Sequence, residues 1–506
     1  MRRIKFWIIG IAVLIGLIVL PPALFIAKVW LHDGRAPLPQ IPAGTDDASR
    51  LNANTPHEVV PVARDPDEAE RQLVALLQRA ANQDLRIAIS GAHHSMGGHT
   101  IYPDGIVLDM LPFNAMSLNK ATQVLTVGSG ARWSQVIPYL DEHGLAVAIM
   151  QSNNDFSVGG SISVNCHGWQ HNAAPIGSSV ESFRIMTADG DTHRCNRTEN
   201  SELFALALGG YGLFGIILEV DLRVVHNEFY TAEAHPVNAA DYDRVYHELT
   251  RDNTYIGMAY GRINVAPGTF LQEGNITLLK RHDDEGQARQ TLRARKPKLL
   301  NRLVFRGGMG SNYGKKLRWR LEKHVGESGG ETLSRNQIMN EPVHVYATRD
   351  PNATDILHEY FVPVARLNDF LETTRPIFLK HQPELMNITV RNVKTDSDTV
   401  LRYAPEAMFG LVMLFQQMRE GADAEAAMQT LTRELIDAAL ACGGRYYLPY
   451  RLHATQEQFL KAYPQAPDFF ARKRHYDPDE RFANQFYLKY GTPTASESHP
   501  QPSATP

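Results

Sequence analysis

Apolar positions in the first half of the chain follow two different periods. Short runs such as "RIAIS", "IVLDM" and "VLTVGSG" are apolar and rich in branched residues, which is typical of buried strands. Between them, "DEAERQLVALLQRAANQ" and "RWSQVIPYLDEHG" repeat apolar residues every three or four positions, which predicts amphipathic helices. The alternation predicts an α+β domain over residues 57–226.

The pattern changes beyond this domain, because the elements become longer. Strands are expected at "YTAEAHPV" and "HEYFVPV", and helices at "VARLNDFLETTRPIFLKH" and "DAEAAMQTLTRELIDAALAC". These elements predict a second α+β domain over residues 227–442. Residues 443–491 form a further segment, and residues 492–506 have the composition of a disordered tail.

The N-terminus carries a long apolar run, "FWIIGIAVLIGLIVLPPALFIAKVWL", which has no charge before Lys28. Its length suits a membrane-spanning helix, so residues 1–31 are expected to be an anchor. The charges favour a cytoplasmic N-terminus and a periplasmic body on the inner membrane, since Arg2, Arg3 and Lys5 precede the run while Lys28 and Arg35 follow. A cleaved signal peptide is the alternative. Residues 32–56 lack a hydrophobic period and predict a linker.

Composition and charge exclude several classes of protein. The 506 residues carry a formal net charge of -4, which argues against nucleic acid as a partner. The three cysteines are far apart and exclude a disulfide framework or a C-x-x-C metal site. One segment is strongly basic: residues 280–323 hold fourteen Lys or Arg and four acids. It fits either docking on anionic lipid or a solvated excursion of loop and helix.

A glycine-rich stretch, "GAHHSMGGHT", follows the predicted strand "RIAIS". Its backbone N–H groups can converge on a pyrophosphate, although it lacks the lysine of a P-loop. A metal site made by His93, His94 and His99 is disfavoured, because no carboxylate or cysteine stands nearby at ligand spacing. Two more glycine-rich blocks follow, "SVGGSISVNCHG" and "LFALALGGYGLFGI", and their bare backbone can approach a flat ligand closely.

These three blocks, together with "YDPDERFANQF" near the C-terminus, resemble the FAD-binding domain of the vanillyl-alcohol oxidase superfamily, the PCMH-type flavoproteins. The resemblance implies two α+β subdomains that clasp FAD, a cap at residues 227–442 over the flavin ring, and a C-terminal segment that returns to the flavin. It implies the following cofactor-binding residues: Ser90, Gly91, Ala92, His93, His94, Ser95, Met96, Gly97, Gly98, Ser157, Gly159, Gly160, Ser163, His167, Gly168, Gly210, Gly212, Gly215, Ile216 and Asn484.

The first block also bears on how FAD is held. The family loop reads approximately R-G-x-G-H-S, and "SGAHHS" matches its H-S pair with His94 and Ser95. In many members this histidine is bonded to the flavin. Ser90 stands where arginine is common, and His93 stands in place of the second glycine. Attachment through His94, attachment through His93, and non-covalent binding with backbone N–H groups on the pyrophosphate therefore remain open. His167 fits either a flavin neighbour or a buried structural histidine.

Among subfamilies, the chain is most similar to the aldonolactone and alditol oxidases and to decaprenylphosphoryl-ribose oxidase. The second similarity rests on "HEYFVPV" and "GGRYYLPYR". The E-x-R of the lactone enzymes has Thr389 and Arg391 here, and their H-W-x-K-x-H becomes "LPYRLH". Arg391 and Arg451 are candidates for anchoring substrate, or else for ion pairs between domains, and Tyr450 and His453 are candidates for proton transfer.

The expected activity is oxidation of a CH–OH group of a sugar, lactone or lipid-linked sugar by hydride transfer to flavin N5. The alternatives are a flavin dehydrogenase acting on another substrate class, such as a lipid C–C bond, with a quinone or cytochrome as acceptor, and a membrane-tethered binding protein without activity. The partners expected are a small-molecule or lipid-linked substrate and the membrane.

Overall fold

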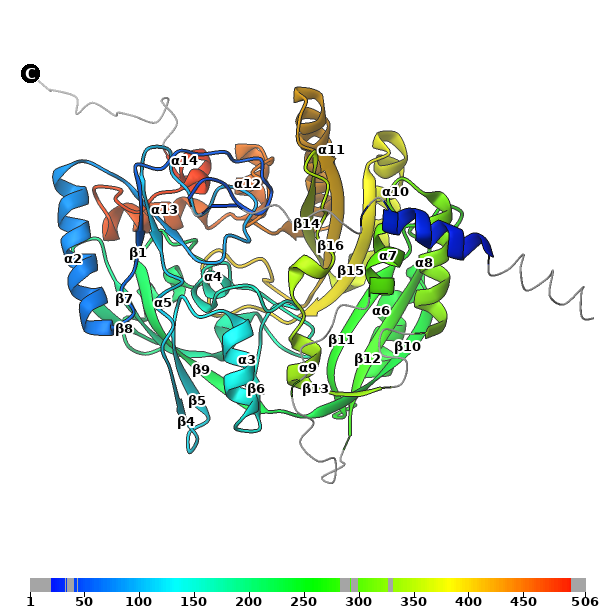
Figure 1. Cartoon of the computed structure of the whole chain (residues 1–506), viewed down its shortest axis with the longest axis horizontal. Coiled ribbons are helices and arrows are strands. Elements are labelled where there is room, and N and C mark those ends of the chain that lie inside the picture. Colours follow the sequence, from blue (N-terminus) through cyan, green and yellow to red (C-terminus); the bar gives the residue numbers. More distant parts are fainter. Residues whose placement is uncertain are drawn as a thin grey trace, which may run out of the picture.

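The computed structural model describes residues 20–31, 33, 41–42, 44–282, 292, 299–325 and 331–492. Figure 1 shows an N-terminal domain and a second, sheet-based domain side by side, and the C-terminal helices lie over the first of them. The predicted mixture of helix and strand is confirmed. The tail beyond residue 492 lies outside the described residues.

Two sheets build the N-terminal domain. The first is parallel, in the order β1-β3-β2, with strands β1 (Glu58–Pro61), β2 (Ile87–Ser90) and β3 (Ile106–Asp109). The second has the order β4-β5-β9-β7-β8, with β6 added on β9; its strands are β4 (Met116–Asn119), β5 (Val124–Gly128), β6 (Leu145–Val147), β7 (Val180–Met186), β8 (Thr192–Cys195) and β9 (Ile216–His226). The helices of this domain are α2 (Pro66–Asn82), α3 (Trp133–Asp141), α4 (Val158–Ser163) and α5 (Ser201–Ala207).

An eight-stranded sheet builds the cap, in the order β13-β10-β12-β11-β15-β16-β14-β17. Its strands are β10 (Phe229–Asn238), β11 (Ile256–Ile263), β12 (Glu273–Arg281), β13 (Thr332–Ser334), β14 (Ala353–Pro363), β15 (Glu384–Val393), β16 (Met408–Met418) and β17 (Arg445–Tyr446). The last strand lies beyond residue 442, so the C-terminal segment contributes to the cap sheet. The helices are α6 (Tyr242–Thr250), α7 (Leu299–Arg306), α8 (Asn312–Val325), α9 (Arg335–Met339), α10 (Leu367–His381) and α11 (Ala422–Ala441).

The cap strands alternate between two faces because successive side chains of a strand point in opposite directions. On β15, Ile388 and Val390 join the main apolar core, whereas Thr389 and Arg391 face the other way into a cavity. Residues of α6, α10 and α11 belong to the same core. The polar face of the sheet is thereby left for the site.

The C-terminal segment returns to the N-terminal domain, through α12 (Gln456–Ala462), α13 (Ala466–Tyr476) and α14 (Gln485–Tyr490). Phe482 pairs with Ile87 of β2 as an isolated bridge. Arg481 donates to the carbonyl oxygens of Ala80 and Leu85, at 3.0 and 2.8 Å. Arg481 and Phe482 therefore hold the C-terminal segment against the parallel sheet.

Part of the expected linker, residues 44–56, packs against the folded domains. Asp47 and Ser49 are buried, and Asp47 Oδ2 accepts a 2.7 Å hydrogen bond from the Gly98 N–H group. Residues 44–56 pack through such polar contacts rather than through apolar side chains, which explains why no hydrophobic period marked them.

The predicted anchor falls mostly outside the described residues, because residues 1–19 are not described. Residues 20–31 are helical. In the part of the chain that the structure describes, none of the helices combines the length and apolar character needed to cross a membrane.

Candidate active site and cofactor site

A cavity of about 1530 Å³ lies between the glycine-rich blocks of the N-terminal domain and the polar face of the cap sheet. The first block contributes its loop after β2, the second contributes α4 and the residues around it, and the third contributes the turn before β9. From the cap come side chains of alternate strand positions, namely Tyr260, Arg262, Asn275, Thr277, Leu357, Glu359, Asn387, Thr389, Arg391, Val412 and Leu414. The cavity thus joins the predicted cofactor blocks to the predicted cap.

A buried carboxylate occupies the cap side of this cavity. The Glu359 side chain is 2% exposed, and its Oε1 atom lies 2.6 Å from Nε2 of His167. Its Oε2 atom accepts a 3.3 Å hydrogen bond from the Tyr450 hydroxyl group. Burial, followed by the charge of Glu359, raises the pKa of Tyr450 well above its ordinary value. Tyr450 is therefore a neutral phenol near pH 7, and Glu359 is placed to receive its proton.

Aromatic rings and a guanidinium group line the neighbouring wall. The rings of Trp169 and Tyr260 stack with centroids 4.9 Å apart, and the Arg391 guanidinium carbon lies 5.3 Å from the Trp169 ring centroid. Arg391 also donates a 3.1 Å hydrogen bond to the Ser152 hydroxyl group. A sugar ring presents C–H groups and hydroxyls, which suit aromatic faces and a guanidinium donor respectively.

His94 faces the cavity from the loop after β2. Its ring stacks on Phe156 at 4.2 Å between centroids. Removal from water lowers the pKa of His94 to about 4, although Asp155 opposes that shift. The imidazole is therefore neutral near pH 7 and keeps a nitrogen lone pair available.

His93 adopts the left-handed backbone conformation, with φ of 58°. Glycine reaches this region without steric cost, which gives a physical reason for glycine at the matching position of the resembling family. The His93 side chain turns back to its own strand, where Nδ1 lies 2.9 Å from Ser90 Oγ. Ser90, at the position where arginine is common, thus holds His93.

The geometry of the three glycine-rich blocks fits a flat cofactor that carries a pyrophosphate. A Cβ atom added at Gly91 would lie 2.1 Å from Ser157 Oγ, so loop and α4 approach too closely for a side chain. Among the described residues, several buried hydroxyl groups of the cavity wall have no hydrogen-bond partner, namely Ser95 Oγ, Thr100 Oγ1 and Ser129 Oγ. Unsatisfied buried donors around bare backbone are what a bound phosphate group would satisfy.

Most of the predicted cofactor residues line the cavity: Ser90, Gly91, Ala92, His93, His94, Ser95, Ser157, Gly159, Gly160, Ser163, His167, Gly212 and Gly215. Among the predicted catalytic residues, Arg391 and Tyr450 do so as well. The cavity brings these residues together from segments that are far apart in the sequence.

Three loop residues expected at the pyrophosphate do not line the cavity. The Met96 N–H group donates to the Pro449 carbonyl oxygen at 2.9 Å, and the Gly98 N–H group donates to Asp47. A Cβ atom at Gly97 would lie 2.4 Å from the Tyr450 carbonyl oxygen. The Met96 N–H group and the close packing of Gly97 thus hold the loop against the C-terminal segment, and Gly98 holds it against Asp47, so the N–H groups of Met96 and Gly98 are engaged within the protein.

Four further predicted residues also lie outside the cavity lining. A Cβ atom at Gly168 would lie 1.9 Å from the Met150 carbonyl oxygen, and one at Gly210 would lie 2.2 Å from that of Leu206. Ile216, the first residue of β9, points into the apolar core that also contains Ile87 and Leu108. Ile217 lines the cavity instead, because successive side chains of a strand point to opposite faces. Asn484 donates to the carbonyl oxygens of His99 and Tyr211, at 3.0 and 2.9 Å. These residues position the blocks rather than line the cavity.

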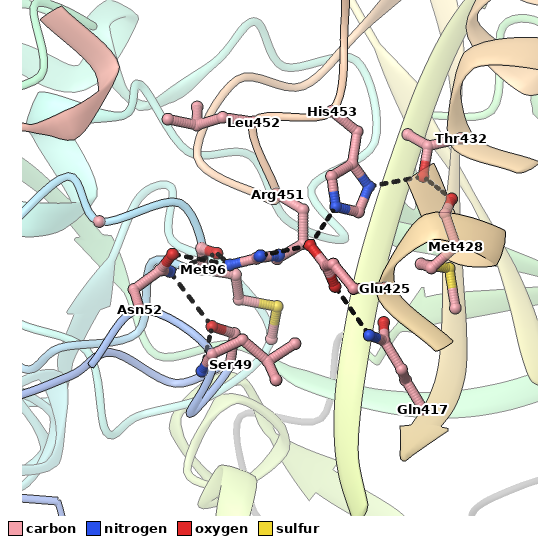
Figure 2. Close-up of polar contacts among 12 residues, drawn as sticks. Ser49, Asn52, Met96, Gln417, Glu425, Met428, Thr432, Arg451, Leu452 and His453 are labelled. Atoms are coloured by element: carbon pink, nitrogen blue, oxygen red, sulfur yellow. Dashed lines mark hydrogen bonds and ion pairs between the residues drawn. The ribbon is translucent and has the colours of Figure 1, made fainter. Parts of the chain in front are cut away.

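Arg451 and His453, expected at the substrate, do not line the cavity either. Figure 2 shows both directed at Glu425 of α11: Arg451 Nη2 and His453 Nε2 lie 2.5 and 2.8 Å from Oε1. Arg451 also donates to Asn52 Oδ1 at 2.8 Å. Burial alone would raise the pKa of Glu425, but hydrogen bonds from His453 and Arg451 lower it below its ordinary value. The alternative of an ion pair between domains describes Arg451 in this structure.

Glu359, Trp169 and Tyr260 were absent from the residues expected at the site. Glu359 stands within "HEYFVPV", a stretch noted only for its similarity to one subfamily. A carboxylate directly before the apolar run "YFVPV" was the signal, because a carboxylate is rarely buried without a partner. Among the described residues no group of three or more His, Cys, Asp or Glu side chains could hold a metal ion.

Comparison with known proteins bears on the cofactor. Residues 67–196 match a family model described as an FAD binding domain. Decaprenylphosphoryl-beta-D-ribose oxidase of Mycolicibacterium smegmatis is 23% identical over 81% of this chain and 91% of its own length. An uncharacterized oxidoreductase of Rhodococcoides fascians is 32% identical over 36% of this chain and 40% of its own length.

A mitochondrial L-galactono-1,4-lactone dehydrogenase of Arabidopsis thaliana is 27% identical over 43% of this chain and 34% of its own length. The chain thus spans less than half of the length of the Arabidopsis thaliana dehydrogenase and of the Rhodococcoides fascians oxidoreductase.

Proposed function

This chain carries an FAD binding domain of the PCMH type and is related to FAD-dependent oxidoreductases, and from that premise we propose its reaction. It oxidises a CH–OH group of a sugar, a lactone or a lipid-linked sugar. The observation that carries the proposal is the Glu359 carboxylate, which joins His167 and Tyr450 in the same cavity as the glycine-rich loop. The similarity to decaprenylphosphoryl-beta-D-ribose oxidase, which is matched over 91% of its own length, supports the substrate class.

FAD supplies the chemistry that the side chains lack, because it accepts two electrons as a hydride from the carbinol carbon. The protein must remove the hydroxyl proton as the C–H bond breaks, so that a carbonyl product forms. In this proposal Tyr450 takes that proton while giving its own to Glu359 Oε2, along the 3.3 Å hydrogen bond. His167 holds the carboxylate in place from the other side.

In this proposal the wall formed by Trp169, Tyr260 and Arg391 orients the substrate. Arg391, held by Ser152 and stacked over Trp169, donates to a substrate oxygen, and the faces of Trp169 and Tyr260 pack against the ring. Such positioning lowers the barrier by fixing the reacting carbon rather than by new chemistry.

FAD is proposed to be bonded through His94. Three properties support this: the side chain faces the cavity, it stacks on Phe156, and its lowered pKa keeps it neutral. His93 is disfavoured since its Nδ1 atom is engaged by Ser90. Acid precipitation separates the outcomes, because a bonded flavin stays with the protein pellet.

The chain is also proposed to be a single-pass inner-membrane protein with a periplasmic body. The support is the apolar run from residue 6 to residue 31 and the excess of cations before it. A reporter fused after Pro506 tests the orientation: activity of a periplasmic reporter agrees, and activity confined to a cytoplasmic reporter contradicts it.

The reaction is tested by anaerobic mixing of the purified full-length chain with candidate substrates and by product analysis. Bleaching of the flavin by a sugar, lactone or prenyl-phosphate sugar, with one carbonyl formed per flavin reduced, supports the proposal. Bleaching only by a lipid with a C–C single bond, with an alkene product, would replace it by a dehydrogenase of that class. Air then identifies the acceptor: rapid recovery of colour means an oxidase, and recovery only with a quinone or cytochrome means a dehydrogenase.

A further inference from the structure

Exposed apolar side chains gather at one end of the cap. They come from three elements: the helix at residues 20–31, called the N-terminal helix here, and α7 and α8. The residues are Leu20, Leu24, Leu31, Leu299, Leu300, Tyr313 and Leu321. Figure 1 shows the N-terminal helix, in blue, beside α7 and α8 at the end of the molecule away from the N-terminal domain. Soluble proteins rarely expose an apolar patch of this kind without a partner.

The N-terminal helix is fixed on α7 and α8 by specific contacts. The Phe25 ring lies 5.2 Å from the Tyr313 ring centroid, and Cβ atoms added at Gly307 or Gly314 would each lie 2.8 Å from Phe25. Just beyond the helix, Arg302 Nη2 of α7 donates to Asp33 Oδ1 at 3.0 Å. Since Phe25 faces the protein, the exposed leucines at positions 20, 24 and 31 form a stripe on the outer side.

Positive charge surrounds this apolar face. Arg302 and Arg306 of α7 are buried and paired with Asp33 and Asp355, so the positive charge of this face comes from α8 and from the N-terminal helix. The helix α8 carries five Lys or Arg with Glu322 as its single acid, and two of these cations, Lys315 and Lys323, are paired with Glu384 and Glu273. Arg318 engages Glu322 at 2.6 Å, while Lys28, Lys316 and Arg320 are exposed. Exposed cations around apolar side chains suit the surface of an anionic bilayer, to which they are attracted electrostatically.

The cavity opens at this same face. Leu300 is 59% exposed and Leu321 is 40% exposed, and both also line the cavity. Val304 and Phe305 of α7 line the cavity too, so apolar side chains continue inward from the opening. An apolar chain lying in this opening would reach from the molecular surface toward the walls that hold Arg391.

From these observations we infer that the face formed by the N-terminal helix, α7 and α8 docks on an anionic membrane. The cavity opens into the bilayer there, and its substrate is an amphiphile whose apolar tail lies between Leu300 and Leu321. A membrane is favoured over a protein partner because the N-terminal helix is the end of the 26-residue apolar run "FWIIGIAVLIGLIVLPPALFIAKVWL". The assignment of the tail rests on the proposed function, whereas docking of the face does not.

Docking is tested with the full-length chain in vesicles of phosphatidylglycerol and phosphatidylcholine. Cys166, Cys195 and Cys442 are buried, so a cysteine introduced by Leu321→Cys is the accessible site for a polarity-sensitive fluorophore among the described residues. Leu379→Cys is the matched control, since Leu379 on α10 is 63% exposed and does not line the cavity. Nitroxide groups on the lipid tails are expected to quench the probe at 321 about threefold more than the probe at 379. Equal quenching at the two positions would overturn the docking.

The path of the tail is tested with a photoreactive diazirine on the chain of a C16 alcohol in the same vesicles. The expected cross-links lie on α7 and α8 near Leu300 and Leu321. Leu300→Asp is expected to reduce them about tenfold, because a charge at the opening opposes entry of methylene groups. Labelling that is unchanged by Leu300→Asp, or that spreads evenly over α10, would overturn the tail assignment. Neither readout needs flavin or turnover, so failure of the proposed reaction would be seen separately.

Discussion

The Nε2 atom of His167 lies 2.6 Å from Oε1 of Glu359. His167 comes from the second glycine-rich block and Glu359 from β14, the strand next to the edge strand β17 of the cap sheet, so one contact joins the N-terminal domain to the cap. The other oxygen of the carboxylate meets the Tyr450 hydroxyl group.

Replacing Glu359 by glutamine should remove the proton acceptor while keeping the side-chain shape. We expect the rate of flavin reduction to fall about 10²- to 10³-fold, with FAD content unchanged, since FAD is held mainly by the N-terminal domain. Stopped-flow absorbance measures the rate, and circular dichroism checks the fold. Tyr450→Phe should have a similar effect. Wild-type rates in both variants would exclude these residues from proton transfer.

Replacing His94 by alanine should release the flavin from the acid-precipitated protein. The matched control is His93→Gly, which removes the neighbouring imidazole and suits the left-handed backbone at that position. We expect His93→Gly to retain bonded flavin and to change the free energy of unfolding by about 1 kcal/mol or less, because relief of backbone strain offsets the lost contact with Ser90. Bonded flavin in His94→Ala that is lost in His93→Gly would reverse the assignment.

A methyl group at Gly97 should be poorly tolerated. Its Cβ atom would lie 2.4 Å from the Tyr450 carbonyl oxygen, and backbone cannot give way as a flexible side chain can. We expect Gly97→Ala to lower the free energy of unfolding by about 1 to 3 kcal/mol and to slow flavin reduction through a displaced Tyr450. Gly308→Ala is the control, because its nearest contact would be 3.3 Å away. Equal stability of both variants would contradict the close packing.

The contact of Glu425 with Arg451 and His453 should make stability depend on pH. Burial lowers the pKa of His453, and the hydrogen bonds of Glu425 lower the pKa of that carboxyl. Both groups therefore bind protons more readily in the unfolded chain, so stability is fully present above their ordinary values and is lost as the pH falls through them. For His453 the loss begins near pH 6.5, and for Glu425 near pH 4.3.

Glu425→Gln should lower the free energy of unfolding at pH 7 by about 1 to 3 kcal/mol and flatten its decline below about pH 4.3, where the Glu425 carboxyl titrates in the unfolded chain. The decline that begins near pH 6.5 should persist, because Glu425 raises the pKa of His453 and its removal lowers that pKa further. Denaturant titrations at several pH values measure both effects. Glu420→Gln, at an exposed position just before α11, is the control and should match the wild type. A wild-type pH profile in Glu425→Gln would show that the contact contributes nothing.

Local patterns were sufficient to predict the elements but not their partners. The helix expected at "DAEAAMQTLTRELIDAALAC" forms as α11, because its apolar period acts within one segment. The partners of its Glu425 come from the C-terminal segment, and no local pattern links them. For the same reason Arg451 was expected at the substrate, although Glu425 and Asn52 hold it elsewhere.

The glycine-rich blocks could be predicted because clusters of glycine can be read directly from the sequence. The hydrogen-bond acceptor of each backbone N–H group could not, because it comes from distant segments of the chain. Gly98 shows the difference, since its N–H group is taken by Asp47 from a stretch expected to be a linker. Ile216 and Ile217 show a related limit: the strand was predicted, but only its position against the core decides which residue faces the cavity.

The most direct test of the central claim is the visible spectrum of the purified full-length chain during titration with FAD. A yellow protein with flavin absorption bands, at one flavin per chain, is the predicted result. A colourless protein that takes up no added FAD would contradict the claim that this cavity is a flavin site, and with it the proposed reaction.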